Sequence, residues 1–407
     1  MSARKLTITF PIAVLIAALI AAASIIAPIM IAPMIAAPAA ERPAEIAGSY
    51  VLDVRDALKN DVKITVKRAD GSIEVYEKAG DPWTVNVMYF IANYLLGREK
   101  VSAVSMIRED GTSRRIETEY VYTGGNTYTN IDPKVVIGIG SGSTPPSVYD
   151  VDLYNPIVKI EVPSTSVSVS DSGTALTATY TASWTATGSY AIRETGLYML
   201  AAELGTNSID DRFLLSRDVL DEPITVESGD VVSVTYTVTM EYARPPLTKH
   251  MAAIIFNYML GLNAYGLART LITTDGTSTT NVDLGYESNT SPYDVIKESA
   301  KLVVGSGAPS YLPTKLAVSN PVATVSDIRV NYQVVNSTHM RIYWVGGVGL
   351  TGEVTVTEVG VYMNTDIEAS NTGNQKDIMV LYFPLSTPVA VPAGGALKFS
   401  FDLYIRA

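Results

Sequence analysis

Cysteine is absent from this chain of 407 residues, and histidine occurs only twice. The first absence excludes disulfides, thiolate nucleophiles and Cys-ligated metal sites. His250 and His339 lie far apart and belong to no repeated motif, so a histidine metal site or a Ser-His-Asp triad has little support. No G-x-S-x-G motif surrounds any serine. We therefore predict no catalytic residue, no metal ligand and no cofactor, and expect a protein that is not an enzyme.

Positive charge is also scarce. The formal net charge is -11, and no basic cluster is longer than Arg114–Arg115, so the clustered lysines and arginines that nucleic-acid binding needs are missing. Charged residues make up 17% of the chain and apolar residues 47%, which argues against disorder. Val, Thr, Ser and 24 tyrosines suit a pleated surface. These features predict a folded, mainly β protein that does not bind nucleic acid.

Residues 6–40 contain no charge and follow Arg4 and Lys5. Residues 6–27 are long enough to cross a bilayer as a helix of about 33 Å, before prolines recur every five residues from Pro28. We predict a membrane anchor with the rest of the chain outside, on a cell surface or virion exterior. A signal peptide cleaved near Ala39, or a pilin-like leader cut near Lys5, are the alternatives. The residues that we expect to lie in the membrane include Pro11, Ile16, Leu19, Ile20, Ile25 and Ile26.

Nearly the same eight residues occur twice: IRETGLYM begins at Ile192, and VTEVGVYM begins at Val356, 164 positions later. The surrounding motifs repeat too, since DGTS, GSG and NP each recur 165 positions on, and IANYLLG (91–97) matches IFNYMLG (255–261). Only ARPPL (243–247) lies at the boundary between the copies. We predict a hydrophobic leader at 1–40, a stalk with a β-hairpin at 41–81, and two repeats at 82–243 and 247–407. Each repeat is expected to open with one short amphipathic helix.

Strict alternation of apolar residues marks the last strand of each copy, where VVSVTYTVTMEY (231–242) aligns with ALKFSFDLYIRA (396–407). Alternation of this kind is typical of a strand with one buried face and one face in water. Several such strands, and a hairpin expected around Asp70–Gly71, indicate two tandem β-sandwich domains. The core positions are Val232, Val234, Tyr236, Val238 and Met240 in the first copy and Leu397, Phe399, Phe401, Leu403 and Ile405 in the second.

The order of motifs in each copy resembles a module of virion and tail-fibre-like structural proteins of phages and archaeal viruses. The first copy carries the resemblance in IGSGSTPPSVYDVDLYNPI (139–157) and ETGLY (194–198), and the second in VGSGAPSYLPTKLAVSNPV (304–322) and EVGVY (358–362). The second copy lacks the acidic residues Asp150 and Asp152. The resemblance implies a structural role without chemistry. Because tail-fibre proteins do not normally carry a membrane segment, a membrane-anchored virion or cell-surface protein fits better.

Glu194 and Glu358 take equivalent positions in the two copies, as a repeated catalytic carboxylate would. Each has apolar neighbours, and no second carboxylate or histidine recurs at a matching offset, so an acid-base pair cannot be assembled. We predict instead that each carboxylate caps backbone N–H groups at a bend. The GSG motifs lack both the G-x-G-x-x-G spacing and a following Lys-Ser/Thr, and are expected to be strand-end turns.

Other acidic and amide residues are candidates for ion binding or modification. Asp150, Asp152 and Asp210–Asp211 lack the spaced ligands of a calcium loop, and are expected to be solvated turn residues. Asn289 and Asn336 begin N-x-S/T sequons and are candidate glycosylation acceptors if the chain enters a glycosylating compartment.

Taken together, these patterns predict a non-enzymatic extracellular protein: a membrane-anchored subunit of a virion coat, spike or cell-surface filament. Its partners would be copies of itself or other coat proteins, together with the membrane. The alternatives are an attachment protein that binds a host glycan or receptor through its distal domain, and a pilin-like subunit whose N-terminal helix forms the filament core.

Overall fold

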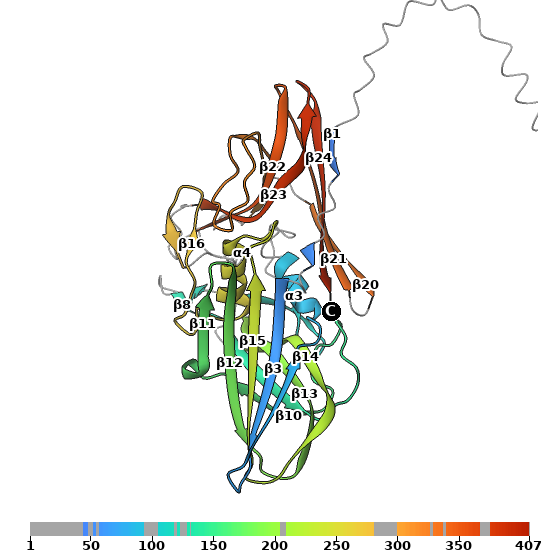
Figure 1. Ribbon diagram of the computed structural model, residues 1–407, viewed down its shortest axis with the longest axis vertical. Coiled ribbons are helices and arrows are strands. Elements are labelled where there is room, and N and C mark those ends of the chain that lie inside the picture. The colour runs from blue at the N-terminus through green and yellow to red at the C-terminus, as the bar shows by residue number, and fades with distance from the viewer. Residues whose placement is uncertain are drawn as a thin grey trace, which may run out of the picture. The chain divides into compact units, whose positions relative to one another are not determined.

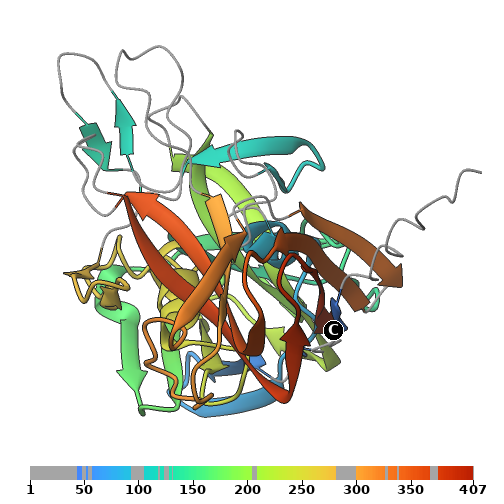
Figure 2. The same ribbon diagram turned by 90° about the horizontal axis from the view of Figure 1, so that it is seen from above.

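β-Strands make up most of the residues that the computed structural model describes, which confirms the predicted mainly β fold class (Figures 1 and 2). The described residues are 44–47, 52–53, 57–92, 105–117, 120–122, 128–130, 132–203, 209–280, 299–325, 329–336, 339–366 and 375–406. Pro43–Ala407 is one compact unit. Among the described residues, no helix has the length and apolar character needed to cross a bilayer. The predicted membrane segment lies outside them.

The first repeat contributes to two large sheets, in the strand orders β11-β12-β15-β3-β4 and β10-β9-β13-β6-β5, with β14 also paired to β13. Tyr236 on β15 bonds Thr195 on β13 and Asp218 on β14, so the two sheets face each other. The strands are β5 (Ser105–Ile107), β6 (Ser113–Glu117), β9 (Lys134–Gly140), β10 (Pro156–Glu161), β11 (Val167–Asp171), β12 (Ala175–Thr185), β13 (Tyr190–Glu203), β14 (Ile209–Val226) and β15 (Val231–Glu241). A 3-10 turn, η2 (Ser164–Ser166), and a two-stranded sheet of β7 (Tyr120–Tyr122) and β8 (Tyr128–Asn130) complete this part.

The hairpin predicted around Asp70–Gly71 is present as β3 (Leu58–Lys67) and β4 (Ile73–Ala79). It is not a separate element, because β3 pairs antiparallel with β15 from Lys67 opposite Val231 to Leu58 opposite Met240. Two shorter strands precede it, β1 (Ala44–Ala47) and β2 (Leu52–Asp53), and both pair in parallel with β24 of the second repeat. The segment predicted as a stalk and hairpin therefore supplies strands to both repeats.

The second repeat pairs its strands as the first one does, in the orders β20-β21-β24 and β19-β18-β22-β23. Glu194 stands opposite Gly140 in the first repeat, and Glu358 stands opposite Gly305 in the second. The strands are β16 (Leu271–Ile272), β17 (Ser278–Thr279), β18 (Ser299–Gly305), β19 (Pro321–Val325), β20 (Arg329–Asn336), β21 (His339–Gly349), β22 (Val354–Asp366), β23 (Gln375–Val391) and β24 (Ala396–Arg406). Figure 1 shows β21 in orange tones beside β24 in red, and β15 in yellow-green between β12 in green and β3 in blue.

Each repeat opens with a short helix, α3 (Val85–Phe90) and α4 (Lys249–Ile254), and α4 continues into a π-helical turn, η3 (Ile255–Met259). Thr84 and Thr248 are the N-caps, and their hydroxyls accept bonds from the N–H groups of Asn86 and Met251. The predicted amphipathic character is wrong, because residues 250–260 are all buried. Ala252, Ala253, Phe256 and Leu260 are buried together with Met251, Ile254, Ile255, Tyr258 and Met259, so the helix is apolar nearly all round.

The two repeats share one hydrophobic core, which runs without interruption from strands of the first repeat to strands of the second. The Tyr180 hydroxyl of β12 donates to the Leu260 carbonyl oxygen at 2.7 Å, and the Val135 N–H donates to the Tyr265 hydroxyl at 2.8 Å. Lys249 at the start of α4 pairs with Asp171 at 2.7 Å. Since α4 and the residues after it contact the first repeat, burial of the second repeat's helix depends on the first.

Candidate functional site

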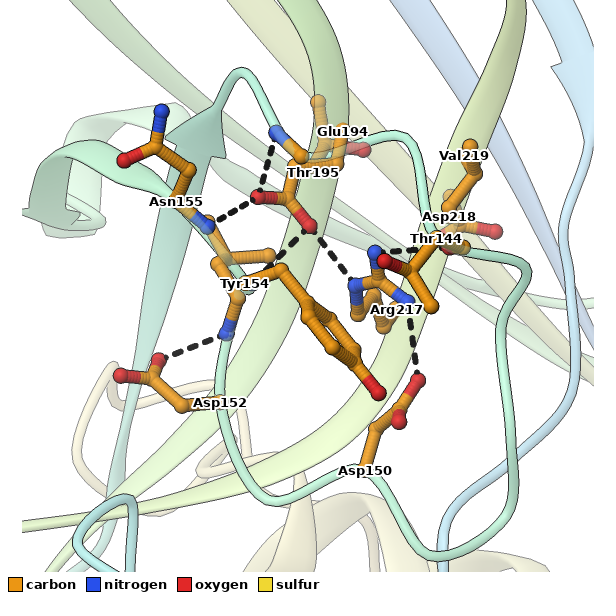
Figure 3. Close-up of polar contacts among 12 residues, drawn as sticks. Thr144, Asp150, Asp152, Tyr154, Asn155, Glu194, Thr195, Arg217, Asp218 and Val219 are labelled. Carbon is orange, nitrogen blue, oxygen red and sulfur yellow. Dashed lines mark hydrogen bonds and ion pairs between the residues drawn. The ribbon is translucent and has the colours of Figure 1, made fainter.

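The repeated octamer places a fully buried glutamate against the loop at 141–155 in the first repeat. Glu194 Oε1 accepts bonds from the N–H groups of Gly142 at 2.9 Å and Asn155 at 2.8 Å. Its Oε2 accepts the Tyr154 N–H at 3.2 Å and the Arg217 Nε–H at 2.7 Å (Figure 3). The prediction that this carboxylate caps backbone donors at a bend is confirmed. Both oxygens are occupied, so they hold the loop on β13.

Arg217, on β14, connects this carboxylate to a second one. Its Nη1 lies 3.0 Å from Asp150 Oδ2, and its Nη2 donates to the Thr144 carbonyl oxygen at 2.9 Å. The guanidinium also stacks 4.4 Å from the centre of the Tyr154 ring (Figure 3). Only 1% of the arginine side chain is exposed. The residues of this first-repeat network are Thr144, Asp150, Tyr154, Asn155, Glu194 and Arg217.

The second repeat places Glu358 in the same position but surrounds it with different groups. Its Oε1 accepts the Ser319 N–H, and its Oε2 lies 2.7 Å from Lys315 Nζ and accepts the Tyr382 hydroxyl. Lys315 Nζ also lies over the Tyr382 ring, 4.3 Å from its centre. We call Lys315, Ser319, Glu358 and Tyr382 the second-repeat network.

The two networks obtain their positive charge from different elements. Asp150 and Lys315 are equivalent loop positions, 165 residues apart. Arg217 and Tyr382 are equivalent strand positions, because each stands opposite the glycine of its octamer. The loop is acidic and the strand basic in the first repeat, whereas the loop is basic and the strand neutral in the second. Both arrangements give the buried glutamate a cation.

The glycine and tyrosine of the octamer hold the same loop a second time. A Cβ on Gly196 would lie 2.9 Å from Tyr198 Cε2, and one on Gly360 would lie 2.6 Å from Tyr362 Cε2, so each ring packs where a side chain would stand. The ring brings its hydroxyl to the loop, where it accepts the Leu153 N–H at 3.2 Å or the Val318 N–H at 2.7 Å. The glutamate, glycine and tyrosine of each octamer therefore attach the equivalent loop of their own repeat, which accounts for the recurrence of the octamer.

The GSG motifs are strand-end turns, as predicted, since β9 ends at Gly140 and β18 ends at Gly305. A Cβ at Gly140 would lie 2.6 Å from Glu194 Oε1, and one at Gly305 would lie 2.9 Å from Glu358 Oε1. These glycines leave room for the carboxylate, and that packing accounts for their recurrence.

A second polar cluster lies between the two sheets of the first repeat. The buried Asp218 carboxylate accepts the Tyr236 hydroxyl at 2.7 Å and the Asp81 N–H at 2.5 Å, and Thr195 Oγ1 lies 2.9 Å from the Tyr236 hydroxyl. Burial is the main cause that raises the pKa of Asp218 to about 6. The second repeat has Val359, Phe383 and Phe401 at the positions of Thr195, Asp218 and Tyr236, so its sequence replaces this cluster with apolar residues.

The prediction that Asp150 and Asp211 are solvated turn residues is wrong. Asp150 and Asp211 are buried rather than solvated, because Asp150 pairs with Arg217 and Asp211 pairs with Arg108 at 2.9 Å. A second carboxylate lies near Glu194, because Arg217 pairs with both Glu194 and Asp150. In the described part of the chain, no group of three or more His, Asp or Glu side chains could hold a metal ion.

The remaining predicted residues are distributed as follows. Val232, Val234, Tyr236, Val238 and Met240 are buried along β15, and Leu397 and Phe399 are buried along β24. Phe401, Leu403 and Ile405 continue β24, and their side chains lie outside the described set. The six residues of the membrane segment and Asn289 also fall outside the described residues, whereas Asn336 is exposed at the end of β20. His250 is buried in α4, and burial lowers its pKa to about 4.

The sequence analysis missed Arg217, Lys315 and Tyr382, the groups that neutralise or bond the repeated glutamates. One signal could have found them: at the two offset-165 pairs, Asp becomes Lys in the loop while Arg becomes Tyr in the strand. A paired change of this kind indicates contact between the two positions.

Searches with family models, against curated proteins and against solved structures all find no match for this chain.

Proposed function

We propose that this chain is a non-enzymatic structural subunit that stands outside a membrane and assembles with copies of itself or with other coat proteins. The observation that carries the proposal is how the glutamate of the repeated octamer is bonded. The buried glutamates that recur in both repeats have their oxygens bonded to loop N–H groups, to a cation or to a hydroxyl. A carboxylate held in this way is poorly suited to proton transfer, and well suited to making a loop rigid.

In this proposal, residues 82–243 and 247–407 are two tandem β-sandwiches. The support is the equivalent pairing in the two repeats, such as β12 with β15 and β21 with β24 along their full lengths. The joint between them is held as a building block requires, since the Tyr311 hydroxyl lies within hydrogen-bond distance of the Tyr242 carbonyl oxygen and 2.9 Å from the Leu247 carbonyl oxygen. A stiff joint gives every copy the same shape, which a regular assembly needs.

Residues 6–27 supply the membrane anchor, and the product is a coat, a spike or a surface filament. If the leader is instead cut near Lys5 and packs in a filament core, the same outer part forms a pilin-like subunit. In the anchored form and in the pilin-like form alike, the protein is exported and associates with copies of itself.

The test is to express the full chain, separate membranes by flotation, and examine them by negative-stain microscopy. We expect the protein to float with membranes, to resist extraction by carbonate, and to form regular arrays or filaments. N-terminal sequencing then distinguishes a retained Met1 or Ser2 from a terminus near Leu6. A product that remains soluble and monomeric at all concentrations would contradict the proposal.

A second candidate, an attachment protein, is favoured by one observation. The loops held by the two networks carry large exposed side chains, among them Tyr149 at 53%, Tyr154 at 57% and Leu312 at 57% exposure. Rigid loops with exposed aromatic or aliphatic groups suit recognition of a glycan or receptor. Binding of the monomeric protein to host cells, lost in Leu312→Ser or Tyr149→Ser, would favour this candidate over the building block.

A further inference from the structure

The edge of β24 is covered differently from the equivalent edge of β15. In the first repeat, β3 pairs antiparallel with β15 in an unbroken register from Leu58 to Lys67. In the second repeat the edge of β24 is covered by β1 and β2, which pair in parallel over four residues and two residues. Every other strand pair that the structure describes is antiparallel.

The edge needs this cover because an open β-strand edge presents unpaired N–H and C=O groups to solvent and to other chains. β24 is an eleven-residue strand, and β21 occupies its other edge from Ala396 to Arg406. Without β1 and β2, the edge of β24 opposite β21 would therefore be open. A strand from outside the repeat is required to close it.

Four of the six register pairs between the two short strands and β24 are matched in chemical type. Ala44, Ile46 and Leu52 stand opposite Leu397, Phe399 and Leu403, so apolar residues are opposite apolar residues. Glu45 stands opposite Lys398, which adds a pair of opposite charges. The β24 edge thus selects a particular partner sequence, and that sequence occurs in every copy of this chain.

The chain topology allows this partner to come from another molecule. β1 and β24 are the first and last of the described strands, so no short loop joins them. Only residues 54–57 separate β2, which pairs with the second repeat's sheet, from β3, which pairs with the first repeat's sheet. A short connection between strands bound to different sheets is the setting in which identical elements exchange between copies. A membrane-held leader would further raise the local concentration of neighbouring copies.

We propose that β1 and β2 of one copy close the β24 edge of a second copy, so that subunits are linked by exchanged parallel strands. This deepens the proposed function, on which it rests, by naming the surface that joins the subunits. Each copy gives one segment and accepts one, so the contact is head-to-tail and can continue into a chain of subunits.

The test uses the absence of cysteine, because any thiol crosslink then reports the introduced pair. Full-length Glu45→Cys and Lys398→Cys variants are expressed separately and together in membranes and treated with a short bismaleimide. We expect a covalent dimer when the two single variants are expressed together, and no dimer from either variant expressed alone. The double variant should give a ladder of covalently linked species. A double variant that closes only within single chains, with no dimer from the mixture, would overturn the proposal.

Lys63→Cys with Thr235→Cys is the matched control, since these residues stand opposite each other on β3 and β15. This pair should close within one chain and give no dimer from mixed single variants. The outcome also separates the two proposals. If regular arrays form but the Glu45→Cys/Lys398→Cys crosslink joins residues of one chain only, strand exchange is overturned and the structural role is left intact. If crosslinked dimers form without arrays, strand exchange is supported and the building-block proposal is contradicted.

Discussion

The two repeats attach the same loop with the same glutamate, glycine and tyrosine, but they compensate the buried charge in different ways. In the first repeat Arg217, from a strand, lies between Glu194 and the loop residue Asp150. In the second repeat Lys315, from the loop itself, reaches Glu358. The comparison teaches that the shared part is the geometry of the loop attachment. The buried carboxylate requires a cation, but that cation can come from a strand, as in the first repeat, or from the loop, as in the second.

The repeats also differ in how deeply that cation is buried. The Arg217 side chain is 1% exposed and serves two carboxylates, whereas Lys315 is 10% exposed and serves one. Because an uncompensated charge costs more free energy the less water reaches it, the first repeat should depend more strongly on its cation.

Arg217→Met should produce the largest loss. It leaves Glu194 and Asp150 buried without a positive charge, and we expect the free energy of unfolding to fall by about 3–5 kcal/mol. Lys315→Met is the matched change, and should cost about 1–3 kcal/mol, because Ser319 and Tyr382 still bond Glu358. Both are measured by denaturant unfolding. Equal losses in the two variants would show that the depth of burial does not separate the repeats.

The second prediction is a pH dependence of stability that comes from Asp218, a residue of the first repeat with no carboxylate equivalent in the second. Because burial raises the pKa of Asp218 from 3.8 to about 6, the folded state binds more protons than the unfolded state between these values. Stability from this group is therefore fully present below about pH 4 and is lost as pH rises to about 6, by about 3 kcal/mol.

Unfolding measured from pH 4 to pH 7 checks this dependence, with Asp218→Asn as the comparison. The variant should lack the decline between about pH 4 and about pH 6. A wild-type stability that rises steadily over this range, in parallel with the variant, would contradict the raised pKa.

A glycine substitution should affect both repeats alike. Gly196→Ala and Gly360→Ala each place a methyl group against the octamer tyrosine ring, and we expect each to cost about 1–3 kcal/mol. Gly352→Ala is the control, since a Cβ there meets no atom within 4 Å, and its effect should stay within about 0.5 kcal/mol. Thermal unfolding of the three variants decides whether the ring contact is equally tight in the two repeats.

The smallest effect concerns the tyrosine hydroxyls. Tyr198 donates to Asp152 at 2.6 Å as well as accepting the Leu153 N–H, so Tyr198→Phe should cost about 1–2 kcal/mol. Tyr362→Phe loses the bond from the Val318 N–H, and should cost about 1 kcal/mol. Denaturant midpoints of the two variants test the order. A larger loss in the second repeat would reverse the comparison.

Much of the local structure could be predicted from the sequence because its causes are local. Alternation of apolar residues predicted strands such as β15, turn residues predicted the β3–β4 hairpin, and the recurrence of GSG predicted where β9 and β18 end. The prediction that the repeated glutamate caps backbone donors is confirmed, and it could be made because no second carboxylate or histidine recurs with it at a matching offset.

The rest could not be predicted because it depends on residues that are distant in the chain. Arg217 meets Asp150 only after β14 pairs with β13, and α4 is buried on all sides only because both repeats pack around it. The pairing of Ala44 with Leu397 joins residues from opposite ends of the chain, and no periodicity in either segment specifies it.

The sequence by itself determined that this protein is mainly β, that it contains one motif twice, and which faces of its last strands are apolar, because period and recurrence are properties of the chain. Only the tertiary structure decided which cation neutralises each buried glutamate, which helix faces are covered, and which strand closes β24. Those outcomes follow from contacts between distant segments, where burial sets the free-energy cost of an unpaired charge or an open edge.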